Sequence, residues 1–375
     1  MTRTDSYDLV FIGLTVTSSW GNGHATTYRG LIRELDKKGY SVLFLERDMP
    51  WYALHRDMPE LPYGKVELYG SVQDLKNRFS RIVQDAELVV VGSFVPDGIA
   101  VGEWVQHQSR GICAFYDIDT PVTLSKLSRR ENDYITPELV SGYDLYLSFA
   151  GGPTLDLLEG VYGAPVARAL YCSVDSEQYQ PLDVDKTYDL GYMGTFSPDR
   201  QESLELLMIE AAKRCSERKF VVAGPQYPAK IEWPQNIQRI EHIAPGDHPH
   251  FYSSQRFTLN LTRADMISAG YAPSVRLFEA AACGVPVISD YWDGLDQFFE
   301  LESEILISRS WEQTVEIISQ VSTQDSSNMG QRARNRVLEK HTAFHRAEEL
   351  LFYMQEALQV KRKKYRNRNY VSRNV

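Results

Sequence analysis

The stretch that decides the fold of this chain is Ser268–Phe299, SAGYAPSVRLFEAAACGVPVISDYWDGLDQFF. Its pattern predicts a loop, a short helix, a sharp stop and a buried strand. Pro273 suits a first helical turn, where a missing N–H costs nothing. Gly284 can adopt the left-handed conformation that ends a helix, and the apolar run Val285–Ser289 after it is typical of a buried strand.

Three polar residues, Ser274, Arg276 and Glu279, lie within this otherwise apolar helix. A buried carboxylate is costly unless it is hydrogen-bonded, and the free amides at a helix N-terminus attract anions. The pattern therefore predicts a ligand with hydroxyl groups at Glu279 and an anionic group at Ser274. The alternative is an ion pair between Arg276 and Glu279 on one helix face, which would contribute only ~0.2–0.5 kcal/mol.

Strand and helix patterns alternate along the rest of the chain. The apolar run Asp8–Leu14 is followed by a Gly/Ser/Asn loop, a helical pattern to Leu35 and a second strand at Ser41–Leu45. This order predicts an α/β fold with parallel, doubly wound sheets. Further strands are expected at Leu88–Val91, Gly111–Tyr116, Leu145–Phe149, Phe220–Ala223, Phe257–Leu261 and Ile305–Ile307. A linker rich in Asp, Pro and Gln at Ser173–Lys186 separates two halves.

The stretch SVRLFEAAACGVPVISDYWDGLDQFF resembles the nucleotide-sugar site of GT-B glycosyltransferases, specifically the CgeB-like (spore-maturation-type) proteins, which are related to glycosyltransferase family 4 and the glycosyl transferases group 1. The segments SSWGNGHATTYRGL, FLERDMPWYALHRDMP, DLGYMGTFSPDRQESLELL, FVVAGPQYP and LNLTRADM fit the same family. The resemblance implies two Rossmann-like domains facing a cleft. They are an acceptor-side domain at 1–172 and a nucleotide-sugar domain at 187–341, with a helix at 342–360 that crosses back to the first.

Two loops of the second half are expected to meet the donor. Backbone amides of Gly194 and Thr195, together with Arg200, are candidates for phosphate binding; the alternative is a strand-to-helix turn capped by Ser197 or Asp199. The tight turn from Gly224 to Tyr227 occupies the position that contacts the base in GT-B enzymes.

The resemblance further implies that Glu279 holds the ribose hydroxyls. The retaining transferases carry a second Glu eight residues earlier, and this chain has Tyr271 there, which leaves the stereochemistry open. Arg263 is the candidate for stabilising the diphosphate leaving group. A guanidinium in that role agrees with the expectation that no metal is needed.

The candidate catalytic residues of the first half are His24 and Asp119. His24 follows the loop Ser18–Gly23, whose glycines allow close approach of a ligand to the backbone. It is a candidate general base or a donor to phosphate; the alternative is a simple helix start. Asp117 and Asp119 follow a buried strand and are expected to face the cleft, so Asp119 competes for the role of base.

Composition excludes some classes of function. The chain of 375 residues has a net charge of −10, which argues against general nucleic-acid binding. Its cysteines show no metal-ligand spacing and suit a reducing compartment. No apolar run approaches ~20 residues, so we expect a soluble, cytoplasmic protein. The basic segment 361–375 is expected to be disordered, with weak contact to an anionic surface as the alternative.

These observations predict a metal-independent glycosyltransferase, of the hexosyltransferase type, that moves a sugar from a nucleoside-diphosphate sugar to an acceptor hydroxyl. No cofactor is expected, UDP is the expected nucleotide because it is the commonest donor for this fold, and the acceptor is open. A non-catalytic nucleotide-sugar-binding or scaffold protein of the same fold is the alternative, which Tyr271 keeps open.

Overall fold

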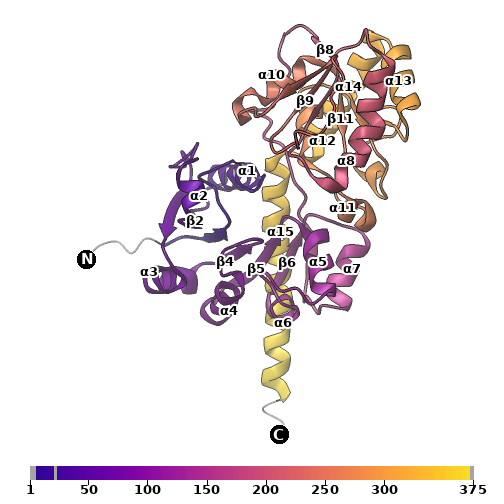
Figure 1. Cartoon of the computed structure of the whole chain (residues 1–375). Coiled ribbons are helices and arrows are strands. Elements are labelled where there is room, and N and C mark those ends of the chain that lie inside the picture. Colours follow the sequence, from indigo (N-terminus) through magenta and orange to yellow (C-terminus); the bar gives the residue numbers. More distant parts are fainter. Residues whose placement is uncertain (1–5, 21–22, 372–375) are drawn as a thin grey trace. The chain divides into compact units, whose positions relative to one another are not determined.

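The computed structural model describes residues 6–20 and 23–371 and divides into two compact units. The N-terminal unit comprises Met1–Tyr171 together with Ala343–Val375, and the C-terminal unit comprises Cys172–Thr342. Each unit is built on its own parallel sheet (Figure 1).

Within its described residues, the N-terminal unit has a seven-stranded parallel sheet in the order β3-β2-β1-β4-β5-β6-β7. The strands are β1 Leu9–Gly13, β2 Val42–Arg47, β3 Lys65–Tyr69, β4 Leu88–Gly92, β5 Ile112–Asp117, β6 Leu145–Ser148 and β7 Ala167–Ala169. The strand order reverses direction between β1 and β4. Most strands read as continuous apolar runs, which is typical of parallel strands covered on both faces.

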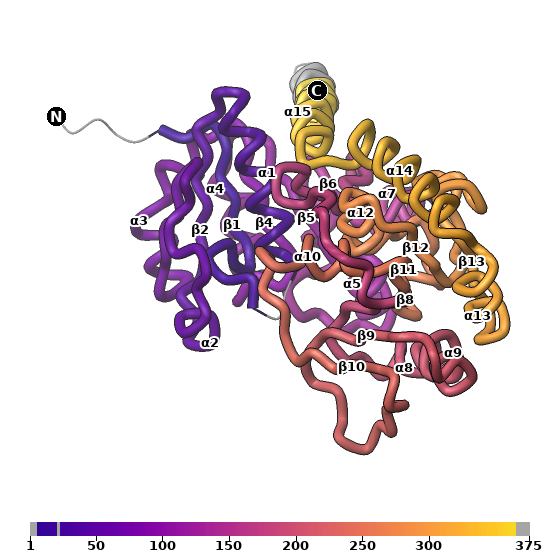
Figure 2. Tube along the Cα trace, turned by 90° about the horizontal axis from the view of Figure 1, so that it is seen from above, coloured from indigo at the N-terminus to yellow at the C-terminus, as the bar shows by residue number. Residues whose placement is uncertain are grey.

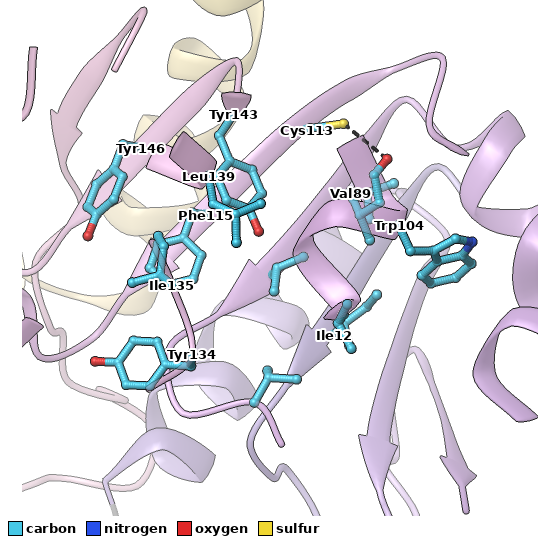
Figure 3. Packing of buried hydrophobic residues seen from close by; sticks show 14 of the residues in the cluster. Ile12, Val89, Trp104, Cys113, Phe115, Tyr134, Ile135, Leu139, Tyr143 and Tyr146 are labelled. Carbon is cyan, nitrogen blue, oxygen red and sulfur yellow. Dashed lines mark hydrogen bonds between the residues drawn. The ribbon is translucent and has the colours of Figure 1, made fainter. Parts of the chain in front are cut away.

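Helices connect these strands and cover the sheet. They are α1 His24–Lys37, α2 Pro50–Ala53, α3 Val72–Asp85, α4 Gly98–Gln108, α5 Thr120–Ser128, α6 Pro137–Gly142 and α7 Pro153–Gly160. Figure 3 shows part of one core layer, in which Ile12, Val89 and Phe115 of the strands pack with Trp104 of α4 and Tyr143. All are buried, so this layer contributes hydrophobic free energy to the N-terminal unit.

The opposite face of this sheet is covered in part by α15, Ala343–Val371, which packs on α1, β5 and β6 (Figure 1). Its buried side chains recur every three or four residues: Ala347, Leu350, Met354 and Ala357. This spacing places them on one helical face. Burying a Leu or Met contributes roughly 1.5–3 kcal/mol each, so α15 is an integral part of the N-terminal unit.

The expectation of disorder at 361–375 is corrected by this helix, which continues to Val371. Lys361 Nζ donates to the Gly111 carbonyl oxygen at 2.6 Å and to Asp144 at 2.8 Å. Extending a packed helix needs no new nucleus, and the Lys and Arg residues of this segment favour helix. Residues 372–375 lie outside the described residues.

The C-terminal unit, all of whose residues are described, has a six-stranded parallel sheet in the order β10-β9-β8-β11-β12-β13 (Figure 2). The strands are β8 Tyr188–Met193, β9 Phe220–Ala223, β10 Ile237–Ile240, β11 Gln255–Asn260, β12 Val287–Ser289 and β13 Ile305–Ile307. The predicted doubly wound α/β class is confirmed. The short strands β3, β7 and β10 were not expected from the sequence.

The helices of this unit are α8 Pro198–Leu204, the π-helix η1 Glu205–Ile209, α9 Glu210–Arg214, the 3-10 turn η2 Pro245–Asp247, α10 His248–Ser253, α11 Ala264–Ala269, α12 Val275–Ala282, the 3-10 turn η3 Leu295–Gln297, α13 Trp311–Gln320 and α14 Thr323–Lys340. Leu190, Phe257 and Ile288 of its strands pack with Met208 and Ile318 of its helices in a buried cluster. Among the described residues, no helix is both long and apolar enough to span a bilayer.

The short helix predicted in the deciding stretch is α12, which is buried from Arg276 to Ala282. Gly284 has φ +70° and its amide donates to the Ala281 carbonyl oxygen at 2.8 Å, so the predicted stop is confirmed. Pro273, however, lies before the helix rather than in its first turn. Ser274 occupies the N-cap position without a side-chain hydrogen bond to the helix, and this places the proline one residue before the N-cap.

Candidate functional site

The strand order of the C-terminal sheet reverses between its central strands β8 and β11. In open parallel sheets, ligands bind beyond the carboxyl ends of the strands at such a reversal, because the flanking loops diverge there. The loop that begins at Gly194 follows β8, and Arg263 follows β11 by three residues. The candidate donor residues thus flank the position that the fold itself favours for a ligand.

Two glycines bring the loops after β8 and β9 into contact. Gly194 N donates to the Ala223 carbonyl oxygen at 2.9 Å, and Phe196 N donates to the Pro225 carbonyl oxygen at 3.0 Å. Gly224 has φ +141°, and a Cβ there would lie 2.0 Å from the Gly194 carbonyl oxygen. The close approach of these two loops therefore requires glycine at 224.

A buried polar network fixes the start of α12. Asn260 Oδ1 accepts from Ser274 Oγ at 2.8 Å and from Arg276 Nη1 at 2.9 Å. Asn260 Nδ2 donates to Ser289 Oγ at 2.9 Å. Ser274 Oγ donates to Asn260 and accepts no hydrogen bond from the first-turn amides of α12. These amides can therefore face an anion.

The Arg276 side chain connects this network to the loop after β8. Its Nε donates to the Met193 carbonyl oxygen at 2.6 Å, and its guanidinium lies over the Tyr192 ring, 4.9 Å from the centroid. A Cβ on Gly194 would lie 3.0 Å from Arg276 Nη2. Arg276 is 8% exposed, and no ion pair joins it to Glu279 among the described residues. The alternative of a helix-face pair is therefore wrong.

Arg200, on α8, adds a second guanidinium. Its Nη2 donates to the Thr195 carbonyl oxygen at 2.8 Å, whereas its Nε is buried with no hydrogen-bond partner in the described chain. Burial, together with the positive charge of Arg276, lowers the pKa of Arg200. Two cationic groups that repel one another at a loop cluster would be stabilised by an anion bound between them.

Arg263 is connected through Asp199 of α8 to the loop that follows β8. Its Nε lies 3.6 Å from Asp199 Oδ2, and that oxygen also accepts from the Ala264 amide at 3.3 Å. Burial opposes ionisation of Asp199, but hydrogen bonds from Ser197 and Ala264 and the charges of Arg263 and Arg200 outweigh it and lower its pKa. Asp199 is therefore a counter-ion that an incoming anion has to compete with. Asp290, whose pKa burial raises, accepts from Thr262 nearby.

Glu279 lies on α12 about one turn after Arg276 and is 6% exposed. Tyr252 Oη donates to its Oε2 at 2.9 Å. Burial and the charge of Glu279 raise the pKa of Tyr252 and of Tyr179 well above the usual value, so both hydroxyls remain donors at neutral pH. Two tyrosine hydroxyls thus lie near this carboxylate, and neither tyrosine was predicted from the sequence.

Tyr227 belongs to an aromatic cluster beside the glycine loops. Its hydroxyl donates to the Gly194 carbonyl oxygen at 3.1 Å, and its ring packs edge-on against Phe196 and Trp233. The Arg239 guanidinium lies over the Tyr227 ring, 4.2 Å from the centroid. Aromatic and guanidinium planes of this kind can stack on a nucleobase.

Tyr271 has an unusual backbone. Its φ of +49° is in the left-handed region, which is uncommon for a bulky side chain. Its amide donates to the Asp293 carbonyl oxygen at 2.6 Å, and its ring packs against Gly294, where a Cβ would lie 2.3 Å from ring atom Cδ1. The surroundings hold this strained residue between α11 and α12.

In the N-terminal unit, the strand order reverses between β1 and β4, and His24 starts α1 after β1. The imidazole is 6% exposed and packs edge-on against Phe94, which follows β4. Burial lowers its pKa to about 4. His24 is therefore neutral at pH 7 and has the form required of a general base. Gly21 and Asn22 of the preceding loop lie outside the described residues.

Asp117 and Asp119, at the end of β5, have different surroundings. Asp117 is fully buried and accepts from Tyr146 Oη at 2.6 Å and Thr123 Oγ1 at 2.8 Å. Burial raises its pKa to about 7. The expectation that Asp117 faces a cleft is wrong, because its carboxylate points into the core, where Tyr146 and Thr123 donate to it. Asp119 is partly exposed at the N-cap of α5, so it remains the candidate base of the pair.

Carboxylates also hold the loop that precedes His24. Glu46 is fully buried; its Oε2 accepts from the Val16 amide at 2.7 Å and the Thr17 amide at 3.0 Å. Asp57 accepts from Ser19 and forms an ion pair with Arg29 at 2.9 Å. Although burial opposes its ionisation, the Arg29 and Ser19 hydrogen bonds lower the pKa of Asp57 to about 2. The described part of the loop, from Val16 to Ser19, is thus held by two carboxylates.

The fold thus brings together eight candidate residues of the C-terminal unit: Gly194, Thr195, Arg200, Gly224, Tyr227, Arg263, Ser274 and Arg276. Glu279 follows Arg276 by three residues on α12. His24 and Asp119 belong to the N-terminal unit. Asn260 was not predicted as a site residue, although a polar residue at the end of the apolar strand β11 is a signal for one. Among the described residues, no group of three or more His, Cys, Asp or Glu side chains is placed to hold a metal ion.

Comparison with known proteins gives one family match. Residues 200–352, which include Arg200, Arg263 and Glu279, match the family described as glycosyl transferase-like. No curated protein matches the chain.

Solved structures match nearly the whole chain at low identity. Anabaena HepE in complex with UDP and glucose has a TM-score of 0.69 and 12% identity, covering 93% of this chain and 99% of that one. Sucrose-phosphate synthase from Thermosynechococcus elongatus has a TM-score of 0.64 and 12% identity, covering 96% and 100%. An E. coli trehalose-6-phosphate protein bound with UDP-2-fluoro glucose has a TM-score of 0.64 and 10% identity, covering 92% and 98%. The chain therefore has the GT-B fold of two Rossmann-like doubly wound domains.

Proposed function

We propose that this protein is a metal-independent GT-B glycosyltransferase of the CgeB-like type, which transfers a hexosyl group from a UDP-sugar to an acceptor hydroxyl. The observation that carries the proposal is the cationic cluster of Arg200, Arg276 and Arg263 beside the uncapped start of α12. It lies where the C-terminal sheet reverses. Asp199 and Asp290 offset only part of its charge, so a diphosphate suits it. The UDP and UDP-sugar complexes of the structural neighbours support uracil as the base.

In this proposal the acceptor oxygen attacks C1 of the sugar, and the bond from C1 to the diphosphate oxygen breaks. Negative charge then develops on the diphosphate, where fixed guanidinium groups stabilise it without having to reorganise. Glu279 accepts the ribose hydroxyls, and the Tyr227 cluster flanks the base. The proton of the acceptor goes to His24 or Asp119 as general base.

A second candidate is a nucleotide-sugar-binding protein that performs no transfer. Tyr271, which occupies the position of the acidic residue of retaining transferases, favours it. Such a protein would bind the nucleotide and release neither UDP nor sugar from the donor.

Thermal melting against UDP, GDP, dTDP and CDP, each with and without EDTA, tests the binding. A ligand at ~100 times its Kd stabilises by ~2.7 kcal/mol. We expect a shift with UDP that EDTA does not change, that Arg200→Met strongly reduces, and that Lys213→Met leaves intact. Lys213 is a matched control because it is exposed on α9 and paired with Glu210.

Absence of a shift with any nucleotide would refute the donor site. Release of UDP from UDP-glucose or UDP-galactose on prolonged incubation then separates the two candidates. Slow donor hydrolysis supports the enzyme, whereas binding without any hydrolysis or transfer supports the non-catalytic protein.

A further inference from the structure

The surroundings of Glu279 are unusual for a buried carboxylate. Among the described residues, no Lys, Arg or His forms an ion pair with it. A neutral phenol is its hydrogen-bond donor instead: Tyr252 Oη donates to Oε2 at 2.9 Å. A buried charge normally needs several donors. The remaining acceptor capacity of Glu279 is therefore open to a ligand.

The donor on the protein side is rigidly held. Tyr252 is fully buried on α10, which packs on α12. Its ring packs edge-on against Phe251, and the adjacent Ser253 carbonyl oxygen accepts from Lys186 Nζ at 2.8 Å. Tyr179 also lies close enough to interact with Glu279, and its hydroxyl lies 3.0 Å from His248 Nδ1. The two hydroxyls come from different segments of the chain, Tyr252 from α10 and Tyr179 from the stretch before β8.

The orientation of the carboxylate plane matters for a diol. The last torsion of a glutamate is broad, so the side chain by itself does not fix the plane of its two oxygens. A hydrogen bond to one oxygen selects one orientation. A vicinal diol needs two acceptor directions at once, and an ionised carboxylate has about four lone-pair sites to supply them.

We propose that Tyr252 is a positioning residue for donor recognition: its hydroxyl orients Glu279 so that the carboxylate accepts both the 2′- and 3′-hydroxyls of the nucleotide. The site then selects ribonucleoside over 2′-deoxyribonucleoside diphosphates. This inference rests on the proposed function. In it, Tyr252 does not bind the ligand itself. It affects specificity by holding Glu279 in the orientation that binds the diol.

Calorimetric titration of the full chain with UDP and with 2′-deoxy-UDP tests it. For the wild-type protein we expect a preference for UDP on the order of tenfold or more, because a hydrogen bond to a charged acceptor is lost with the deoxy ligand. Tyr252→Phe should weaken UDP binding about five- to tenfold and change 2′-deoxy-UDP binding by less than about twofold, so that the preference collapses.

Tyr188→Phe is the matched control, since Tyr188 Oη donates to Gln238 in the same unit and does not touch Glu279. It should leave both affinities and their ratio unchanged. In a Glu279→Gln background, Tyr252→Phe should have no further effect on the ratio, because the carboxylate that it orients is absent.

An equal loss of affinity for both ligands in Tyr252→Phe would show a merely structural role and overturn the inference. An unchanged preference in Tyr252→Phe would overturn it while leaving the proposed function intact. Failure of the wild-type protein to bind UDP would instead remove the proposed function and the inference together.

Discussion

Replacing Gly224 by alanine tests how the two glycine loops build the donor site. The added Cβ would lie 2.0 Å from the Gly194 carbonyl oxygen and 3.1 Å from Thr195 N, both backbone atoms that no side-chain rotation can move. Overpacking of this kind costs roughly 1–3 kcal/mol. The φ of +141° adds strain of order 1–3 kcal/mol for an L-residue. Together we expect a destabilisation of roughly 2–6 kcal/mol, a large part of a typical domain's stability.

Native-state hydrogen exchange is a suitable assay, because peptides from β8 and β9 report on the C-terminal unit separately. Gly246→Ala is the matched control: no atom lies within 4 Å of its Cβ position and its φ is not positive. This variant should stay within about 0.5 kcal/mol of the wild type. Nucleotide binding should fall in Gly224→Ala, since the displaced Gly194 carbonyl oxygen also accepts from Tyr227.

The reasoning would be refuted if Gly224→Ala exchanged amides in β8 and β9 as slowly as Gly246→Ala does. In that case the loops would have room to separate at little cost, and the close approach would not be needed for the site.

Three further predictions concern charged groups. Asp199→Asn removes the counter-ion of Arg263, so UDP should bind several-fold more tightly at low salt, with a smaller gain at high salt; titration at two salt concentrations checks this, and weaker binding would contradict it. The pKa of Asp117 is raised by burial to about 7 from an unfolded value of about 3.9, so its contribution to stability is present below about pH 4 and lost as pH rises through 7. Asp117→Asn should therefore flatten the decline in melting temperature between about pH 4 and 7, and an unaltered profile would count against it. Glu46→Ala should destabilise the N-terminal unit by roughly 1–3 kcal/mol in urea unfolding, because two buried amides lose their acceptor; Glu60→Ala, at an exposed position, should change little.

The sequence predicted the sheets well because their strands are continuous apolar runs separated by turn residues. β4, β9 and β11 are of this kind. The strands it missed are short or lie at or next to the edge of a sheet, where the apolar signal is weak: β7 reads ARA and β10 reads IQRI. Pro273 was predicted in the first helical turn but lies two residues before Val275, the first residue of α12, because the pattern alone does not show which residue is the N-cap.

The candidate site was predictable where polar residues interrupt apolar runs, as Glu279 and Arg276 do. The hydrogen bonds between residues far apart in the sequence could not be predicted. Tyr252 and Glu279 are 27 residues apart, and Arg276 bonds the Met193 carbonyl oxygen 83 residues away. Such contacts depend on the register of packed helices and strands, which no local pattern contains.

The N-terminal unit is discontinuous in sequence, because α15 completes it after the whole C-terminal unit has been made. During synthesis the C-terminal sheet can pair its strands before α15 exists, while α1, which packs on α15, still lacks that helix. Until residues up to Ala357 have been made, this core layer lacks Ala347, Leu350, Met354 and Ala357. A premature stop anywhere before α15 would leave a complete C-terminal unit and an N-terminal unit that lacks part of its core.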